Sequence, residues 1–477
     1  MGLIRKIAVN NLILIAERGL VALAGFLVSV WLIRYFGSEK FGAYSLVFAW
    51  FTFLNIFTPP MIEQVVAREA VRFPERMQKF LGAGIVIKTA LSLAGWFAGV
   101  SAAYLLGYPR QTIFFLAIVF LGLLGNASYV LQVPHQIELR LLKPALADGF
   151  SNLFYQAGRA VMIVLKLGLL PFFWLYLAFR ILQLALFFAL GLEKKEYRPD
   201  WRFSFHEVSE IFRASWVLLI INIFVMVISR IDQLMIYPVW GPRAVGLYGS
   251  CANLTDYLIM IPSVWYITVF PLIARYLGES QDSFQKANQY SFKYLTIAAV
   301  LLWIIFAGFS QDAIQLLFGP DYIDAKDALF WLSTSMVSVF IYLGLFNIAV
   351  SRGKEKVWIA VNAAGALINV ALNLTLIPRY GIAGAGFATF SAYSLQIVLC
   401  GILKDFRPDF LLMLKSALWP ILLGASIIAA AKLFELSLIS WLAPAVIVYS
   451  ALLLLTRTIN EKDLRMVWKA FRPGNNG

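Results

Sequence analysis

The chain has 477 residues, of which 61% are hydrophobic and 14% are charged, and its formal net charge is +14. A water-soluble protein of this length could not bury so much apolar surface, so the composition excludes the soluble classes and predicts a polytopic membrane protein. The basic residues are dispersed over short loops, which indicates attraction to anionic lipid headgroups and not binding of nucleic acid.

Apolar runs of roughly 20 residues, the length that crosses a bilayer, recur fourteen times along the chain. We expect membrane-spanning helices at 8–34, 42–66, 80–106, 111–134, 144–169, 171–191, 211–238, 247–272, 288–310, 327–350, 357–378, 384–403, 409–433 and 437–457. Of the 40 Lys and Arg residues, 27 lie in segments on the side of the amino terminus and 8 in loops on the opposite side. Because basic loops are retained in the cytoplasm, this bias predicts that both termini are cytoplasmic.

A short signature occurs twice, each time between two expected helices. Residues 37–44 read GSEKFGAY and residues 241–248 read GPRAVGLY, 204 residues further on. Further landmarks repeat at an offset of 207: Ala67-Arg68 with Ala274-Arg275, Lys79 with Lys286, and Pro171 with Pro378. We therefore predict two tandem six-helix halves of one fold, the usual architecture of alternating-access transporters.

This repeat divides the chain into four parts. We expect a first lobe at 1–191, a polar cytoplasmic linker at 192–210 and a second lobe at 211–403. The remainder, 404–477, supplies a helix pair without a counterpart in the repeat and a cytoplasmic tail. The two cysteines, Cys251 and Cys400, both fall inside expected helices, so no disulfide framework or metal site is indicated.

Basic residues inside the expected helices mark the first candidate site. They are Arg18, Lys88, Arg159, Arg180 and Arg230. A charge at bilayer depth costs about 2.5–3.5 kcal/mol on insertion scales, so such side chains normally face a polar interior. We predict that they line an electropositive chamber for an anionic ligand such as a pyrophosphate, which a guanidinium binds through two hydrogen bonds. In the structural alternative, Arg18 pairs with Glu17 or a neighbouring helix, Arg230 pairs with Asp232, and Lys88 reaches the cytoplasmic edge.

Polar residues at helical spacing extend the predicted chamber along the helices at 8–34, 144–169, 211–238 and 357–378. The predicted lining residues are Asn11, Asn152, Gln156, Asn222, Gln233, Asn362, Asn369 and Asn373. The alternative is that these side chains only mediate helix packing. Asp232 and Asp256 could couple transport to Na⁺ or a proton. We expect no other cofactor, no metal and no enzymatic activity, because neither a nucleotide-binding motif nor a nucleophile–base constellation is present.

Four stretches of the sequence carry a family resemblance. They are 34–45 (RYFGSEKFGAYS), 229–232 (SRID), 317–322 (LFGPDY) and 369–385 (NVALNLTLIPRYGIAGA). Together they resemble the polysaccharide transporters, the O-antigen flippase-like family of the multidrug/oligosaccharidyl-lipid/polysaccharide (MOP) exporter superfamily. The resemblance implies an all-α prokaryotic inner-membrane protein of fourteen helices, with two six-helix lobes, a carboxy-terminal helix pair and a cationic cavity.

The resemblance also implies a function. Members of this family flip undecaprenyl-pyrophosphate-linked sugar units, such as O-antigen repeats, across the membrane by alternating access. The implied partners are the lipid-linked glycan, membrane lipids and the polysaccharide polymerase machinery. Three alternatives stay open: a flippase for lipid-linked peptidoglycan precursors, a cation-coupled drug exporter with an acidic aromatic chamber, and a membrane scaffold without polar stripes inside the bilayer.

Overall fold

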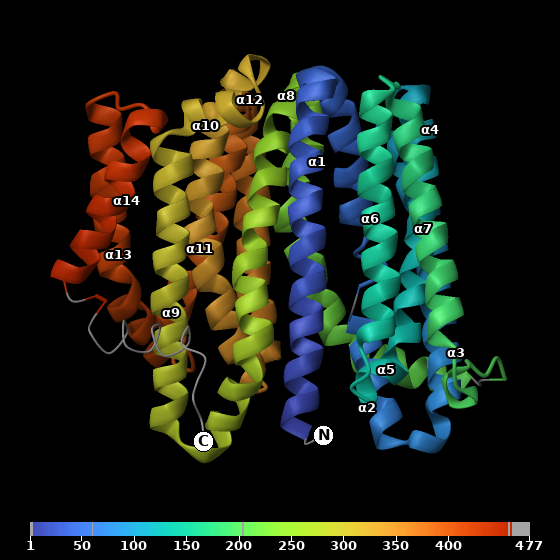
Figure 1. Cartoon of the computed structure of the whole chain (residues 1–477). Coiled ribbons are helices and arrows are strands. Elements are labelled where there is room, and N and C mark those ends of the chain that lie inside the picture. The colour runs from blue at the N-terminus through green and yellow to red at the C-terminus, as the bar shows by residue number, and fades with distance from the viewer. Residues whose placement is uncertain (1–2, 60, 203–204, 457, 460–477) are drawn as a thin grey trace. The chain divides into compact units, whose positions relative to one another are not determined.

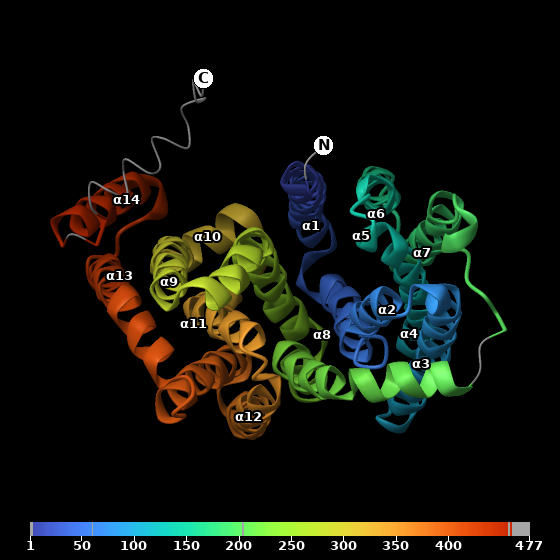
Figure 2. The same cartoon turned by 90° about the horizontal axis from the view of Figure 1, so that it is seen from below.

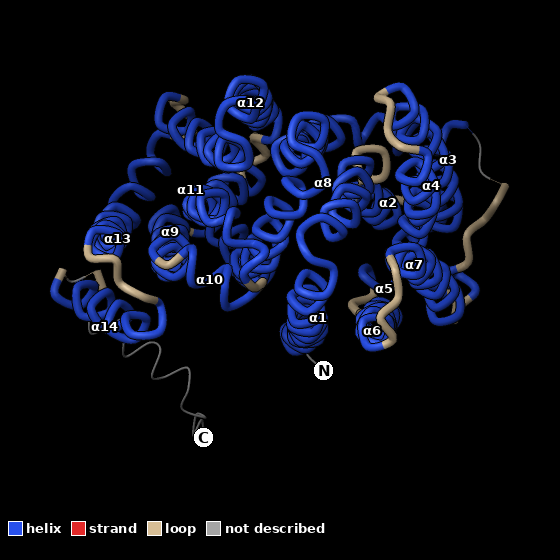
Figure 3. The backbone as a smooth tube through the Cα atoms, turned by 90° about the horizontal axis from the view of Figure 1, so that it is seen from above, coloured by secondary structure: helices blue, strands red, loops and turns tan. Residues whose placement is uncertain are grey.

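A computed structural model describes residues 3–59, 61–202, 205–456 and 458–459, and of residues 3–16 it describes the backbone only. Helices dominate this part of the chain, which contains no strand (Figures 1 and 3). The predicted all-α membrane class is thereby confirmed. Ten helical stretches of the described part are long and apolar enough to cross a membrane. The number fourteen stays a prediction, and the tail from residue 460 lies outside the described residues.

The helices follow one another with short connections. The first part of the chain forms α1 (Leu3–Leu54), α2 (Met61–Arg72), α3 (Met77–Leu105), α4 (Arg110–Phe120), α5 (Val133–Ile137), α6 (Leu142–Val164) and α7 (Leu169–Gly191). The remainder forms α8 (Phe205–Glu279), α9 (Gln281–Trp303), α10 (Ser310–Leu317), α11 (Lys326–Ser351), α12 (Glu355–Ile402), α13 (Arg407–Leu433) and α14 (Leu438–Leu455). A 3₁₀ segment at Leu121–Gln132 continues α4, and a π-helical turn at Ile304–Gly308 continues α9.

Three helices turn at a single glycine. In α1, α8 and α12, the residues Gly37, Gly241 and Gly381 have φ angles of 68°, 72° and 57° between two helical runs. A residue with a Cβ is strained in this left-handed region, so glycine allows the helix to change direction at one position. Gly37 and Gly241 are the first residues of the two signature copies. Each signature therefore joins two helical runs through one residue.

The two signature copies also contact each other through their backbones. A Cβ added to Gly42 would overlap the carbonyl oxygen of Pro242 and lie 3.0 Å from the amide nitrogen of Gly246. A Cβ on Gly246 would overlap the carbonyl oxygen of Ser38 and lie 2.9 Å from the nitrogen of Gly42. The helical runs that follow Gly37 and Gly241 thus cross at a distance that only glycine permits.

The contacts divide the chain into two compact units. Unit 1 comprises 1–257 and 355–385, and unit 2 comprises 258–354 and 386–477. Parts of the predicted second lobe therefore group with the first half of the chain, since the crossing of the two signatures attaches the start of the second half to α1. The lobe boundaries drawn from the sequence stay a prediction.

Inside unit 1, α6 packs against both α1 and α7, and α3 packs against Leu121–Gln132 (Figure 2). Its apolar core includes Val66, Phe80 and Phe187, all at most 2% exposed. Inside unit 2, α9 packs against α11 and α13, and α13 packs against α14. There Arg352 donates two hydrogen bonds to Asp409, one of them 2.9 Å long, and this ion pair joins the end of α11 to the start of α13.

Candidate functional site

A small polar cavity of about 120 Å³ lies in unit 1, where three helical runs meet. Its lining comes from the run of α1 after Gly37 and from both runs of α8. The lining residues are Ser45, Phe48, Ala49, Thr52, Arg230, Gln233, Gly249, Asn253 and Asp256. Ligand pockets usually measure about 300–1,000 Å³, so in this conformation the cavity holds only a group of a few atoms.

Glycine again determines how closely the walls of this cavity approach. A Cβ on Gly249 would overlap the hydroxyl of Ser45, which itself lies 3.4 Å from the side-chain carbonyl oxygen of Gln233. Gly249 and Ser45 each lie three residues beyond the glycines that cross. The signature therefore places the polar face of α8 directly against the polar face of α1.

Arg230 is the only basic residue among the described residues that line this cavity. Its Nη2 donates to Asp256 Oδ2 at 2.7 Å, while its Nε is buried and has no hydrogen-bond partner among the described residues. The Arg230 side chain is 17% exposed and that of Asp256 is 44% exposed. Because a guanidinium carries five N–H donors, this residue can bind a further anion.

The expected partner of Arg230 is engaged elsewhere. Asp232 accepts hydrogen bonds from the backbone N–H of Gln233 at 2.8 Å and from the hydroxyl of Tyr248. Residues two apart point to different sides of a helix, which explains why the pairing of Arg230 with Asp232 does not form. The carboxylate that Arg230 does bind lies 26 residues further along α8, beyond the turn at Gly241.

A second cation, Arg159, lies in a network that shares the same helices. Its guanidinium donates to Gln156 Oε1 and, at 3.3 Å, to Ser29 Oγ, and it lies 5.0 Å from the centre of the Tyr155 ring. The side chain is 5% exposed. Among the described residues, no carboxylate lies within 4.0 Å of it. A buried guanidinium with only neutral partners costs several kcal/mol, which a bound anion would offset.

Tyrosines connect the Arg159 network to the cavity. The Tyr155 hydroxyl lies 3.1 Å from that of Tyr44, which precedes the cavity residue Ser45. The Ser29 hydroxyl lies 3.1 Å from that of Tyr257, which follows the cavity residue Asp256. In the sequence, the two signature tyrosines served only as landmarks of the repeat. The structure shows that Tyr44 supports the Arg159 network and Tyr248 binds Asp232.

Comparisons with known proteins decide the family. Residues 31–327, more than half of the chain, match the family described as polysaccharide biosynthesis protein. The chain belongs to this family. It is also 33% identical over 118 residues to an uncharacterized membrane protein of Methanocaldococcus jannaschii, a match that spans 23% of that relative and 24% of this chain.

Solved structures place this family member in a known fold. The lipid II flippase MurJ in an inward closed conformation matches with a TM-score of 0.70 and 14% identity, covering 94% of this chain and 98% of MurJ. An inward-facing multidrug resistance MATE transporter of the MOP superfamily matches with a TM-score of 0.66 and 14% identity, covering 86% and 95% of the two chains. The fold is that of the MOP superfamily, as the motifs predicted. The chain is thus a member of the polysaccharide biosynthesis protein family that shares the fold of these membrane proteins.

Two of the five predicted cations, Lys88 and Arg180, have partners elsewhere in the bundle. Lys88 donates to Glu63, and the two side chains are 1% and 6% exposed. Arg180 donates to the carbonyl of Gly122 at 2.9 Å, to Gln183 Oε1 at 2.6 Å and to Asn126 Oδ1. Neither side chain lines the cavity of Arg230. Lys88 does not reach a helix end, because its ammonium group is engaged inside the bundle.

The remaining predicted residues are placed as follows. Arg18 is exposed on α1, and the side chain of Asn11 lies outside the described residues. Of the other polar positions, Gln233 lines the cavity and Gln156 binds Arg159, whereas Asn152 donates to the backbone carbonyl of Asp148 at 2.9 Å.

The asparagines predicted to line the chamber from the second half of the chain are deeply buried. Asn222 is 4% exposed, and within the part of the chain that the structure describes its Nδ2 has no hydrogen-bond partner. On α12, Asn362 donates to the carbonyl of Trp358 at 3.1 Å, and Asn373 donates to Asn369 Oδ1 at 3.1 Å. All three α12 asparagines have an exposed fraction of 0%. Of the predicted positions, Gln156 contacts Arg159, whereas Gln233 and Asp256 line the same cavity as Arg230.

Proposed function

We propose that this protein is a flippase that moves undecaprenyl-pyrophosphate-linked oligosaccharides, such as O-antigen or other surface-polysaccharide repeat units, across the membrane. The observation that carries this proposal is the buried guanidinium of Arg159, for which the described residues supply only neutral partners. Its network includes Tyr44 and Tyr257, the sequence neighbours of two residues that line the cavity of Arg230. A pyrophosphate supplies the missing negative charge, and its oxygens match the geometry of both guanidinium groups.

The membership of the family supports a lipid-linked glycan as substrate, and the likeness to a lipid II flippase supports the same headgroup chemistry. A lipid-linked peptidoglycan precursor is the alternative substrate, because it carries the same pyrophosphate. A chamber for cationic drugs is less well supported, since the one carboxylate among the described residues that line the cavity is paired with Arg230.

In the proposed cycle, the polar cavity enlarges to admit the headgroup while the lipid tail stays in the bilayer. In this cycle, the backbone contact of Gly42 with the second signature would close one end of unit 1. Opening of that end requires the helical runs after Gly37 and Gly241 to separate. Binding of the pyrophosphate favours one conformation only if Arg159 and Arg230 contact it differently in the two conformations.

We also propose how transport could be coupled to an ion. The substrate phosphate would replace Asp256 at Arg230, and the released carboxylate would then take up Na⁺ or a proton. Asp232 is the second candidate for this role. The protein would reside in the cytoplasmic membrane of a prokaryote with both termini in the cytoplasm, and would deliver its substrate to a polysaccharide polymerase.

The proposal is tested by expressing Arg159→Ala and Arg230→Ala variants in a strain that lacks its own flippase but produces the lipid-linked glycan. We expect surface glycan to fall at least about tenfold in each variant, since each loses a charge-assisted hydrogen bond of about 1.5–3 kcal/mol. Arg379→Ala is the matched control, because Arg379 is exposed and lies outside the cavity. Wild-type surface glycan in both cavity variants, at equal protein level, would refute the proposal.

A further inference from the structure

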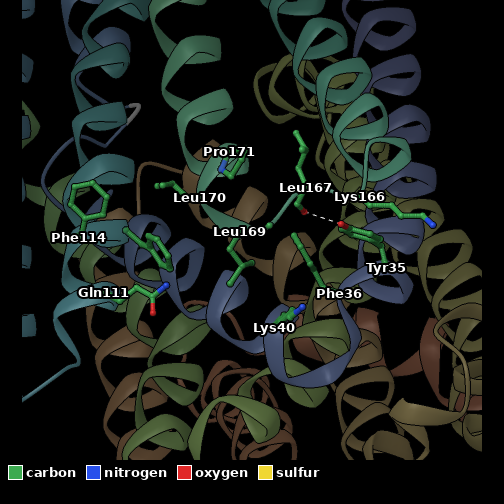
Figure 4. Close-up of a pocket in the computed structure, with 12 residues that line it drawn as sticks. Tyr35, Phe36, Lys40, Gln111, Phe114, Lys166, Leu167, Leu169, Leu170 and Pro171 are labelled. Atoms are coloured by element: carbon green, nitrogen blue, oxygen red, sulfur yellow. Dashed lines mark hydrogen bonds between the residues drawn. The ribbon is translucent and has the colours of Figure 1, made fainter.

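A second, larger cavity of about 510 Å³ lies in unit 1, apart from the residues around Arg159 and Arg230 (Figure 4). It is formed by the turn of α1, the start of α4 and the connection from α6 to α7. Phe36, Phe114 and Phe115 form an aromatic wall, and Leu169 and Leu170 form an aliphatic one. Its volume lies within the range of about 300–1,000 Å³ that is usual for small-molecule sites.

The polar residues of this cavity have one sign of charge. Lys40 and Lys166 contribute two ammonium groups and Gln111 contributes one amide, while no carboxylate is present among the described residues that line it. Both lysines are exposed, as expected for groups that meet a headgroup at the membrane surface. A ligand for this cavity therefore combines a long apolar part with an anionic group.

A hydrogen bond links two of the backbone segments that line the cavity. The hydroxyl of Tyr35 donates to the carbonyl oxygen of Leu167 at 2.8 Å, which joins α1 to the connection between α6 and α7 (Figure 4). In that connection Lys166 has a φ of 54°, a conformation that is uncommon for a residue other than glycine. In Figure 4 the ammonium of Lys166 is turned away from Leu170 and Pro171, and Lys40 lies on the side of Phe36 and Leu169.

The residues that line the cavity favour one kind of amphiphilic ligand over another. A glycan headgroup presents many hydroxyls, each of which needs a hydrogen-bond partner when it leaves water. Gln111 is the only uncharged side-chain amide available here. A small phosphate headgroup needs only cations, and each lysine near an anionic headgroup contributes about 1 kcal/mol. These features favour a phospholipid of the bilayer over the lipid-linked glycan.

We propose that this cavity binds one anionic phospholipid of the surrounding bilayer, with its phosphate at Lys40 and an acyl chain against the aromatic wall. The lipid would connect the turn of α1 to the start of α7. This assignment is independent of the transported substrate, since it uses none of the residues around Arg159 and Arg230.

The test uses the purified full-length protein and native mass spectrometry, with phosphatidylglycerol, phosphatidylcholine or a polyprenyl monophosphate added as the probe. We expect phosphatidylglycerol to be retained at least about fivefold more strongly than phosphatidylcholine. Lys40→Gln should weaken its retention about fivefold. Arg379→Gln removes one exposed charge outside the cavity and should leave retention unchanged.

A second variant tests the apolar part without removing a charge. A Cβ on Gly168 would have no atom within 4 Å, so Gly168→Trp can place an indole in the cavity without displacing the backbone. This variant should lose phosphatidylglycerol while its melting temperature, measured in the absence of added lipid, stays that of the wild type. Equal retention of phosphatidylglycerol in all variants, equal retention of phosphatidylcholine by the wild type, or stronger retention of the polyprenyl phosphate would each overturn the assignment.

Discussion

The buried cations of this chain differ in how their charge is balanced. Lys88 contacts the carboxylate of Glu63 inside the bundle, whereas the described residues offer Arg159 only amide, hydroxyl and aromatic groups. A buried cation whose charge is balanced by a carboxylate needs no further anion, whereas one without a carboxylate gains from an anionic ligand. This difference leads us to assign a structural role to Lys88 and a substrate-binding role to Arg159.

The assignment of Lys88 predicts a stability effect. Lys88→Met leaves the carboxylate of Glu63 buried without its cation, which should destabilise the protein by about 3–5 kcal/mol. The double variant Lys88→Met/Glu63→Leu removes both charges and should recover most of the lost stability. Thermal unfolding of the detergent-solubilised protein measures both. A single variant that melts like the wild type and yet loses transport would instead place Lys88 in the substrate site.

At the scale of residues, the sequence predicted one contact of the candidate site. Gln156 and Arg159 are three residues apart on one helix, so helical spacing alone places them side by side. Helical spacing could not find Asp256 as the partner of Arg230, because α8 turns at Gly241 between them. It also could not show that Lys88 meets Glu63 of another helix. Contacts between helices depend on packing, which one sequence does not reveal.

At the scale of helices, the duplicated signature performs two tasks. Its first glycine turns the helix, and its second glycine allows backbone contact with the other copy. The repeat was visible in the sequence because both tasks require glycine at a fixed spacing. The extent of the resulting helices was not predicted, since the segments after Gly37 and Gly241 were interpreted as loops. A single left-handed residue replaces each expected loop.

This contact predicts that Gly42→Leu and Gly246→Leu prevent the two signatures from closing. Each side chain would overlap a backbone carbonyl of the other copy. We expect transport to fall about tenfold or more, because one conformation of the cycle is lost. Gly19→Leu is the control, since a Cβ on Gly19 would have no atom within 4 Å.

A labelling experiment separates closure from misfolding. Asn253→Cys in a background with Cys251→Ser and Cys400→Ser places one thiol in the polar cavity. A membrane-impermeant maleimide applied from the side of the signatures should label it faster when Gly42→Leu is also present. Unchanged labelling together with normal transport would show that the glycine contact does not close this end.

At the scale of the whole molecule, the fold is that of a MOP superfamily transporter and the chain belongs to the polysaccharide biosynthesis protein family. Hydrophobic runs and the internal repeat predicted a polytopic membrane protein of two tandem halves, and the family was predicted from the resemblance of the motifs. The substrate cannot be obtained in the same way, because dispersed hydrogen-bonding side chains determine it. The cavity of about 120 Å³ is also too small to show the outline of a glycan.

The charge bias makes a prediction for the orientation of the whole chain. With 27 basic residues on the side of the amino terminus and 8 on the other, both termini should be cytoplasmic. A green fluorescent protein fused to the carboxy terminus should fluoresce, and a periplasmic phosphatase fused there should be inactive. The opposite pattern would reverse the assignment of sides and the proposed direction of transport.

The central claim is that Arg159 and Arg230 together bind the pyrophosphate of a transported lipid-linked glycan. Its most direct test is translocation of a fluorescent undecaprenyl-pyrophosphate oligosaccharide in vesicles that contain only this protein, followed by the loss of protection from an externally added quencher. We predict rapid loss of protection with the wild type and at least about tenfold slower loss with Arg159→Ala/Arg230→Ala. Equal rates for the two proteins, or no translocation above that of empty vesicles by the wild type, would contradict the account.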